Sequence, residues 1–483
     1  MNSRPFVYPF KTYGAYYIYD VNKNTIVKTK KEVWDILKDA KCNFDLICDD
    51  ENKDEYSIMN KLKEDGFLSS NKVQKIVHPM NEIIEDYLNS KILMLDLQVT
   101  QQCNFRCEYC PYSGGYDNRA HTNQRMTFEL AKKGIDFLIA HSSEQKQVSV
   151  GFYGGEPLIE FELIKRIIQY IKDNIVGKKV TYSITTNGTL LNENILDFFS
   201  ENDVELSISL DGPKEIHDKS RKFAFNNCGT FDKVIEKVNL IQKNYPEYMK
   251  KVSFNAVIDP QQDVNCICEF FNSFETVNEA FMTYSEIAEN YSKEEINVDE
   301  LYYQQINYEY FKLLLSKLNK MDKKYISKLV LARFTDLETA YRYLRATEKL
   351  PEQMHHAGPC IPGAQRLFLN AYGDFYPCER VSETSPTVKI GNIEQGLDIH
   401  KIINILNIGK LTEEQCKNCW AIRFCSLCVA AVDNGSELSK QLKMKRCIGS
   451  LNAAENKIKD ICVLKEFGYT FTKEKNYSFN VFN

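Results

Sequence analysis

Between residues 91 and 260, short apolar runs alternate with longer segments in which apolar residues recur every three or four positions. The short runs are typical of buried strands, and the longer segments predict amphipathic helices. The expected strands are Ile92–Val99, Ser149–Tyr153, Val180–Ile184, Leu206–Leu210 and Val252–Ile258, and the expected helices are Phe128–Ala140, Phe161–Ile175 and Phe231–Asn244. This alternation predicts an α/β fold with a parallel sheet. In a barrel of this kind the chemistry lies at the carboxyl ends of the strands.

The loop after the first expected strand contains Cys103, Cys107 and Cys110, spaced CxxxCxxC, with the aromatic Tyr109 before the last cysteine. Three thiolates can hold three irons of a cubane [4Fe–4S] cluster and leave the fourth iron open. Structural zinc is the alternative, but it requires four ligands in two pairs, and no second pair lies nearby in the sequence. The spacing therefore favours a reactive cluster.

The composition indicates the cellular compartment and the chemical state of the cysteines. The chain has 16 cysteines, and its first residues lack the apolar core of a signal peptide, so we expect a cytoplasmic protein with reduced thiols. Metal or cluster ligation explains that many cysteines better than disulfides do. A net charge of −5 argues against nucleic-acid binding, and no apolar run is long enough to span a membrane.

Glycine-rich and polar motifs follow the next three expected strands. They are Gly154-Gly155-Glu156-Pro157, Thr185-Thr186-Asn187-Gly188 and Ser209-Leu210-Asp211-Gly212-Pro213, and Arg221 follows the last of them. Glycines let the backbone approach a ligand closely, and an arginine can pair with a carboxylate through two hydrogen bonds. Together with the CxxxCxxC loop, this order of motifs resembles the radical S-adenosylmethionine (SAM) superfamily over residues 91–260.

The resemblance implies a partial (β/α)6 barrel that binds SAM beside the cluster held by the three cysteines. It implies that the glycine motif holds the SAM amino group, that Thr186 and Asn187 face the ribose or methionyl part, and that Ser209 and Arg221 bind the carboxylate. The cofactor-binding residues expected on this basis are Tyr109, Gly154, Gly155, Glu156, Thr186, Asn187, Ser209 and Arg221. Reductive cleavage of SAM would then give a 5′-deoxyadenosyl radical that abstracts a substrate hydrogen.

Seven further cysteines in residues 359–465 resemble the SPASM domain, which holds two auxiliary [4Fe–4S] clusters, for three clusters in all. The resemblance assigns Cys416, Cys419, Cys425 and Cys447 to an outer cluster and Cys360, Cys378 and Cys428 to an inner one. Cys428 departs from the usual spacing by one residue, and a zinc ribbon is the alternative for the CxxC pairs. The inner cluster has either a ligand from elsewhere or an open iron that could bind a substrate thiolate.

The remaining cysteines are expected to be structural. Cys462 is the nearest candidate for a fourth inner ligand, but apolar neighbours favour a small core residue. The others are Cys42, Cys48, Cys228, Cys266 and Cys268.

Residues 1–90 predict a small separate unit: a hairpin of Tyr16–Asp20 and Thr25–Lys28, helices at Lys31–Asp39 and Glu55–Glu64, and a wing strand within Lys72–Val77. This order resembles the winged-helix recognition element of ribosomal-peptide maturases, where a leader peptide adds as a strand. A generic α+β cap is the alternative. The domains expected after it are a radical SAM barrel at 91–290, a helical bridge at 291–358, the SPASM domain at 359–465 and a tail at 466–483.

The segment from Pro359 to Arg380 is similar to thioether-forming maturases of cysteine-rich ribosomal peptides, of the sactipeptide or ranthipeptide type. This implies a radical SAM oxidoreductase that joins cysteine sulfur to carbon in a leader-bearing precursor peptide, with an electron donor such as flavodoxin or ferredoxin. Glu379 is a candidate catalytic base, by resemblance to anaerobic sulfatase maturases; an ion pair with Arg380 or a lysine is the alternative. Formylglycine maturation, carbon–carbon crosslinking, epimerisation and a cluster- or zinc-bearing binding protein remain rival functions.

Overall fold

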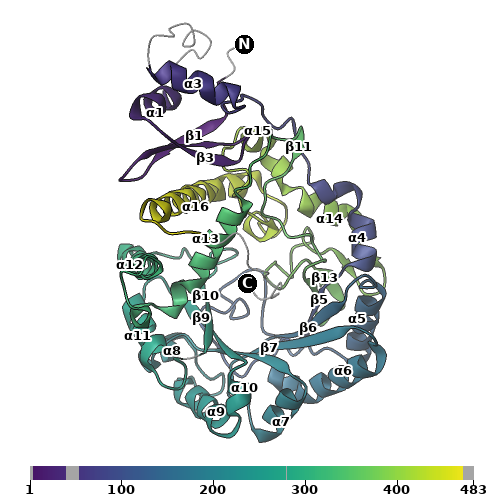
Figure 1. The fold of residues 1–483 in the computed structure, drawn as a ribbon. Helices are drawn as coiled ribbons and strands as arrows, with labels where there is room; N and C mark the ends of the chain where they lie inside the picture. The colour runs from purple at the N-terminus through teal and green to yellow at the C-terminus, as the bar shows by residue number, and fades with distance from the viewer. Residues whose placement is uncertain (1–3, 40–53, 279, 472–483) are drawn as a thin grey trace.

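The computed structural model describes residues 4–39, 54–278 and 280–471. Its centre is a curved sheet in which six consecutive strands are parallel, with helices along its outer side (Figure 1). These strands are β5 (Met94–Thr100), β6 (Gln147–Gly154), β7 (Lys179–Thr186), β8 (Val204–Ser209), β9 (Val252–Ile258) and β10 (Phe281–Glu286). The predicted α/β fold with a partial, barrel-like sheet is confirmed, and β10 is a strand that the sequence analysis did not predict.

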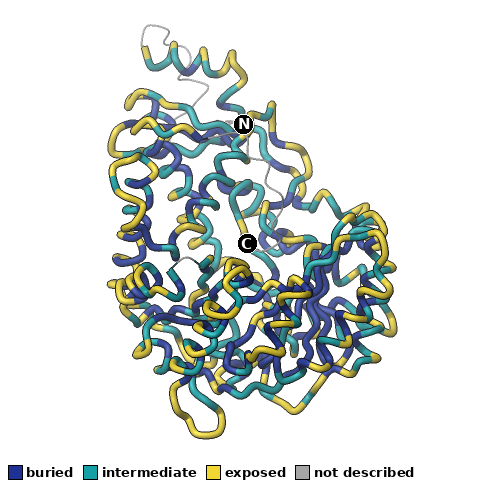
Figure 2. The backbone as a smooth tube through the Cα atoms, turned by 60° about the horizontal axis from the view of Figure 1, so that its bottom comes forward, coloured by how far each residue is buried: buried dark blue, intermediate teal, exposed yellow. Residues whose placement is uncertain are grey.

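Helices follow these strands because their sequences bury one apolar face. In α6, Phe161, Ile164, Ile168 and Ile171 are buried at helical spacing. The helices of this layer are α5 (Phe128–Ala140), α6 (Phe161–Asn174), α7 (Glu193–Glu201), α8 (Lys214–Ser220), α9 (Phe231–Asn244), α10 (Pro246–Met249) and α11 (Val264–Ser273). Figure 2 shows the strands as the most continuously buried part of the backbone.

Strand β5 separates the core from the barrel interior. A Cβ added at Gly134 of α5 would touch the side chains of Leu95 and Leu97, so these leucines face the helices. Since strand side chains alternate, Asp96 and Gln98 face the other side, into the barrel.

The C-terminal region extends the same sheet. Strand β12 (Leu367–Leu369) pairs in parallel with β5, and β13 (Asp374–Tyr376), β14 (Gly391–Asn392) and β15 (Gly396–Leu397) continue antiparallel. Helices α12 (Glu300–Lys317) and α13 (Leu331–Tyr343) precede this region, and α14 (Ile399–Leu406), α15 (Glu413–Lys417) and α16 (Lys440–Glu466) complete it. Cys378, two residues after β13, therefore lies on the β5 side of the barrel.

The N-terminal unit is an antiparallel sheet, β1 (Val7–Lys11), β2 (Tyr16–Asp20) and β3 (Thr25–Thr29), with helices α1 (Lys31–Lys38) and α3 (Asp54–Glu64). The predicted hairpin and both helices are confirmed. The sheet packs on α16 and its surroundings: the Tyr8 ring stacks on Trp420 with centroids 3.8 Å apart, and its hydroxyl donates to Glu455 at 2.7 Å.

A strand forms within the expected range Lys72–Val77, but its predicted role as a wing of the N-terminal sheet is wrong. Strand β4 (Lys75–Ile76) pairs in parallel with β11 (Gln353–Met354) and not with the N-terminal sheet, because Val73 and Ile76 are buried in an apolar cluster with Leu350. Helix α4 (Ile84–Ser90) then leads into β5. Cys42 and Cys48 lie outside the described residues.

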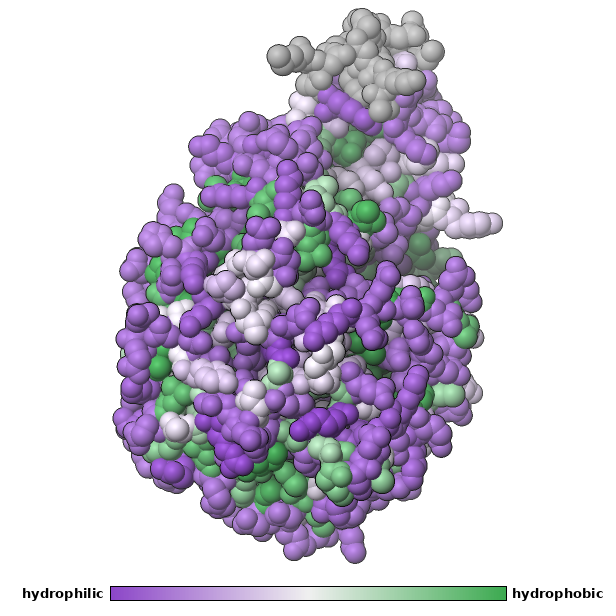
Figure 3. Space-filling model, turned by 180° about the vertical axis from the view of Figure 1, so that it is seen from behind, coloured by the Kyte–Doolittle hydropathy of each residue, from purple (hydrophilic) through white to green (hydrophobic). Residues whose placement is uncertain are grey.

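None of the helices in the described part of the chain has an apolar stretch long enough to cross a bilayer. The face seen in Figure 3 is mostly hydrophilic, with apolar side chains in small separate groups.

Candidate functional site

The motifs found in the sequence meet at one edge of the sheet because β5–β9 are parallel. Gly154 at the end of β6 lies opposite Thr100 at the end of β5, and Thr186 at the end of β7 lies beside Ile208 of β8. The loop with the three cysteines leaves the same edge after Thr100. This edge is where ligands bind in barrels of parallel strands.

The glycine motif lies directly on the start of the cysteine loop. The amide of Gly155 donates to the Thr100 carbonyl at 2.9 Å, and the amide of Glu156 donates to the Gln102 carbonyl at 2.8 Å. A Cβ at Gly154 would lie 2.0 Å from the Thr100 oxygen, and one at Gly155 would lie 2.1 Å from the Gln102 oxygen. No side chain fits at either position, so the two loops form one closely packed backbone surface.

Glu156 ties the end of β6 to the end of β7. Its buried carboxylate accepts from the Leu158 amide at 3.0 Å, the Thr186 hydroxyl at 2.6 Å and the Asn187 amide at 2.7 Å. The Asn187 side chain in turn donates to Asn104 in the cysteine loop at 2.7 Å. In this structure Glu156 and Asn187 hold loops together, and their contact with a cofactor stays a prediction.

A buried ion pair anchors the middle of the site. Arg221 donates from Nε to Asp211 Oδ2 at 2.8 Å and from Nη2 to Oδ1 at 3.0 Å, while the Tyr109 hydroxyl also donates to Oδ2. Burial acts to raise the pKa of Asp211, but the Arg221 charge and these hydrogen bonds hold it below its usual value. Both N–H groups of Nη1 and the second N–H of Nη2 have no hydrogen-bond partner among the described residues and could serve another ligand. The role of Asp211 was missed, although its position right after a strand, ten residues before Arg221, was a signal. Ser209 ends β8, opposite Asn255 of β9.

The three loop thiols lie close enough to influence one another. Burial raises the pKa of the Cys103 thiol, and the Glu156 carboxylate and the thiols of Cys107 and Cys110 raise it further. Burial raises the pKa of Cys107 to about 12, against the opposing charge of Arg221. Among the described residues, no three or more His, Cys, Asp or Glu side chains lie close enough together to hold a single metal ion. Three neighbouring thiols without a fourth ligand side chain among the described residues suit a cubane cluster better than zinc.

The C-terminal thiols form two sets. Burial raises the pKa of Cys419 to about 12, and the thiols of Cys425, Cys416 and Cys447 raise it further. Burial raises the pKa of the Cys360 and Cys378 thiols, the Glu379 carboxylate raises that of Cys378 further, and the nearby Cys428 thiol raises both. The resemblance to the SPASM domain assigns these thiols to an outer and an inner cluster, and both the grouping and the ligation stay predictions.

The other described cysteines lie elsewhere. Cys462 is buried in α16 in an apolar cluster with Tyr17 and Ile458. Cys228 and Cys266 are exposed, and Cys268 is buried in α11.

Glu379 lies in a buried charge network beside the inner thiols. Its Oε1 is paired with Arg366, while Arg380 is more distant at 3.7 Å and largely exposed. Its Oε2 is buried and has no hydrogen-bond partner among the described residues. Arg366 Nε also lies 3.5 Å from Asp96, and burial together with the Glu379 charge raises the pKa of Asp96. Asp96 was missed, although it is the one acidic residue in the apolar run Ile92–Val99.

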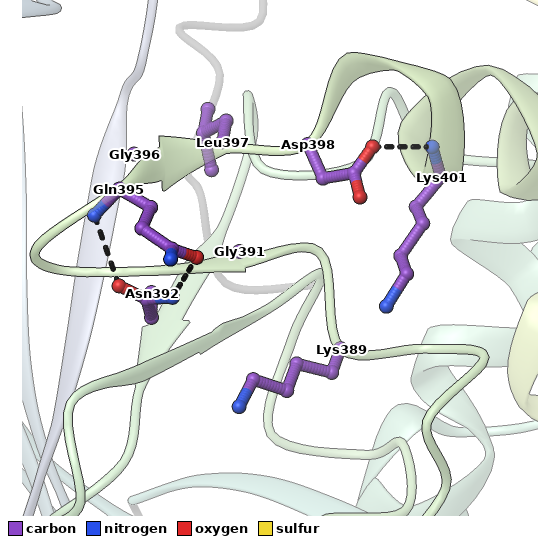
Figure 4. Close-up of a pocket in the computed structure, with 8 residues that line it drawn as sticks. All are labelled: Lys389, Gly391, Asn392, Gln395, Gly396, Leu397, Asp398 and Lys401. Carbon is purple, nitrogen blue, oxygen red and sulfur yellow. Dashed lines mark hydrogen bonds between the residues drawn. The ribbon is translucent and has the colours of Figure 1, made fainter.

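A shallow polar pocket of about 150 Å³ lies at the β14–β15 hairpin and is lined by Asn392, Gln395, Asp398 and Lys401, among others (Figure 4). None of the residues that line it belongs to the motifs above, so we assign it no role in the site.

Comparisons with known proteins match the region that contains these strands and motifs. Residues 97–274 match the family model described as the Radical SAM superfamily. The protein MJ0907 of Methanocaldococcus jannaschii is 28% identical over 331 residues, which cover 68% of this chain and 95% of that protein. A cysteine-type anaerobic sulfatase-maturating enzyme of Clostridium novyi is 36% identical over 160 residues, or 32% of this chain. The radical SAM cyclopropyl synthase TigE of Paramaledivibacter caminithermalis is 27% identical over 236 residues, or 46% of this chain.

The alignments with these two enzymes cover only 41% and 48% of their lengths. The solved structure of native anSMEcpe with bound AdoMet has a similar fold, with a TM-score of 0.57 and 23% identity, and the match covers 77% of this chain and 99% of that one.

Proposed function

We propose that this protein is a radical SAM maturase that forms thioether links in a cysteine-containing precursor peptide, and the match of residues 97–274 to the Radical SAM family model supports this proposal. Cys103, Cys107 and Cys110 hold the first [4Fe–4S] cluster in this proposal, and the two C-terminal thiol sets hold two more. The observation that carries it is the inner set. Cys360, Cys378 and Cys428 are one thiol short of a closed cubane site, and the largely buried Glu379 carboxylate lies close to the Cys378 thiol.

The residues fit the groups that the proposal requires. When bound, SAM and the clusters supply the radical that removes a hydrogen atom from a substrate carbon and the acceptor for the electron released when sulfur joins that carbon. The glycine surface on the cysteine loop offers backbone groups to the SAM amino group, and Arg221 Nη1 offers a donor to its carboxylate. Glu379 Oε2 has no protein partner among the described residues and accepts the proton of the substrate thiol.

The N-terminal sheet is the proposed leader-binding unit. Strand β3 pairs only with β2 among the described strands, so its outer edge can accept the leader as an added strand. An electron donor such as flavodoxin or ferredoxin completes the system.

The test is anaerobic co-expression with a short cysteine-rich precursor encoded beside the gene, followed by mass spectrometry and thiol alkylation. Thioether formation predicts the loss of two hydrogens for each cysteine that can no longer be alkylated. An identical loss with every thiol still alkylatable would instead indicate carbon–carbon chemistry.

Formylglycine formation is the second candidate, favoured by the similarity to sulfatase-maturating enzymes. From cysteine that reaction removes the sulfur from the peptide, whereas a thioether keeps it; from serine it leaves every thiol alkylatable, and the aldehyde it forms tells it apart from carbon–carbon crosslinking. A leaderless copy of the precursor separates the two further, since a leader-dependent maturase should process it poorly.

A further inference from the structure

Lys443 of α16 is a fully buried cation. Only 1% of the residue is exposed. Its ammonium donates to the Ile408 carbonyl at 2.9 Å, to the Thr412 hydroxyl at 2.9 Å and to Cys416 Sγ at 3.6 Å. Among the described residues, no ion pair with a carboxylate includes Lys443.

A charge in this position needs an anion. Taking an ammonium out of water costs several kcal/mol, and lysines are almost never fully buried unless they are paired. Two of the three partners of Lys443 are neutral, and the third is a cysteine that can carry a negative charge. The Thr412 hydroxyl also lies 3.3 Å from Cys416 Sγ, so both side chains converge on that sulfur.

A second thiol of the same set lies near Lys443 on α16. Cys447 lies four residues after Lys443 on α16, so both side chains share a face of the helix. Cys416 and Cys447 belong to the same set of four thiols. A [4Fe–4S] cluster on four thiolates carries a net negative charge in both of its usual oxidation states, and it would place that charge beside the ammonium.

We propose that Lys443 is the fixed counter-charge of the outer cluster and raises its reduction potential. The inference rests on the proposed function, because it requires a cluster on Cys416, Cys419, Cys425 and Cys447. A positive charge stabilises the more negative, reduced state most, and hydrogen bonds to ligand sulfur act in the same direction. A raised potential suits the outer cluster to receive the electron that thioether formation releases. In this proposal Lys443 acts through the outer cluster and contacts no reacting atom.

The experiment compares three variants of the full-length, reconstituted protein. Lys443→Met removes the charge and keeps the length of the side chain, and Lys443→Arg keeps the charge. Lys445→Met makes the same charge change at an exposed position of the same helix, where solvent screens it. The readouts are the iron content and the midpoint potential of each cluster, measured by redox titration followed by electron paramagnetic resonance.

We expect Lys443→Met to disfavour reduction of the outer cluster at least tenfold, which is about 59 mV for one electron. Lys443→Arg and Lys445→Met should keep the wild-type potential. Loss of four irons in Lys443→Met alone would also support the inference, because the charge would then be needed to retain the cluster. Equal potentials in Lys443→Met and Lys445→Met would overturn it, as would loss of the cluster from both Lys443 variants. A wild-type protein without iron at the outer thiols would overturn the proposed function as well.

Discussion

Asp211 and Arg221 form a buried, two-pronged ion pair, with nitrogen–oxygen distances of 2.8 and 3.0 Å. The same carboxylate accepts from Tyr109 in the cysteine loop and from the Val257 amide in β9 at 2.9 Å. One acidic side chain therefore fastens the cysteine loop to two strands of the barrel.

Replacing Asp211 with Asn should lower the stability of the apo-protein by about 3 kcal/mol, because it leaves the Arg221 charge buried without a partner. Thermal unfolding of the apo-protein measures this. Iron retention at Cys103, Cys107 and Cys110 should fall with it. Asp232→Asn is the control, since Asp232 pairs with Lys214 on the surface, where such pairs contribute little. If both variants unfold at the same temperature, the anchoring role of Asp211 is wrong.

Gly155→Ala should abolish SAM binding, measured by calorimetry on the reconstituted protein. The new methyl would lie 2.1 Å from the Gln102 oxygen and 2.5 Å from its carbonyl carbon. Both are backbone atoms, so the cysteine loop itself must move. Gly449→Ala in α16 is the control, because a Cβ there meets nothing within 4 Å. It should stabilise the helix by about 0.5–1 kcal/mol and leave binding unchanged. Wild-type SAM affinity in Gly155→Ala would contradict the close packing of the two loops.

Glu379→Gln should keep SAM cleavage but slow thioether formation about 100-fold, because the amide has the shape of the carboxylate and cannot accept the thiol proton. Quantified 5′-deoxyadenosine and crosslinked peptide separate the two effects. Arg380→Gln is the matched control, since its side chain is 78% exposed and should leave both rates unchanged. Wild-type crosslinking by Glu379→Gln would remove this residue as the base and leave it as a partner of Arg366.

The sequence predicted the barrel strands well because each is an apolar run that ends in a short polar or glycine-rich motif. Helices α5, α6 and α9 were equally clear, since their apolar residues repeat at helical spacing over 13 or 14 residues. Strand β10 was missed because its residues Phe281–Glu286 are partly exposed, and exposure removes the apolar signal. The wing strand failed for another reason: a two-residue strand takes its partner from distant packing, here from β11.

The candidate site was predictable in its residue types but not in its pairings. The resemblance to the SPASM domain assigned the inner and outer sets, and that assignment stays a prediction. It did not reveal that Asp211 takes two nitrogens of Arg221, or that Asp96 and Glu379 share Arg366. The Asp96–Arg366 contact joins residues 270 positions apart in the chain, so no local sequence pattern could reveal it.

The last prediction concerns pH. Asp460 of α16 bonds to Tyr310 of α12 and lies near Arg333 of α13, and burial raises the pKa of Asp460 from 3.8 to about 6. The folded protein therefore binds this proton more tightly than the unfolded chain. The resulting stability is present below pH 4 and is lost as the pH rises to about 6. The melting temperature of the wild type should consequently fall relative to Asp460→Asn between pH 4.5 and 6.5, by an equivalent of about 2 kcal/mol, and stay parallel above that range. Asp232→Asn should follow the wild type throughout. Parallel curves for Asp460→Asn and wild type over the whole range would show that Asp460 titrates alike in both states.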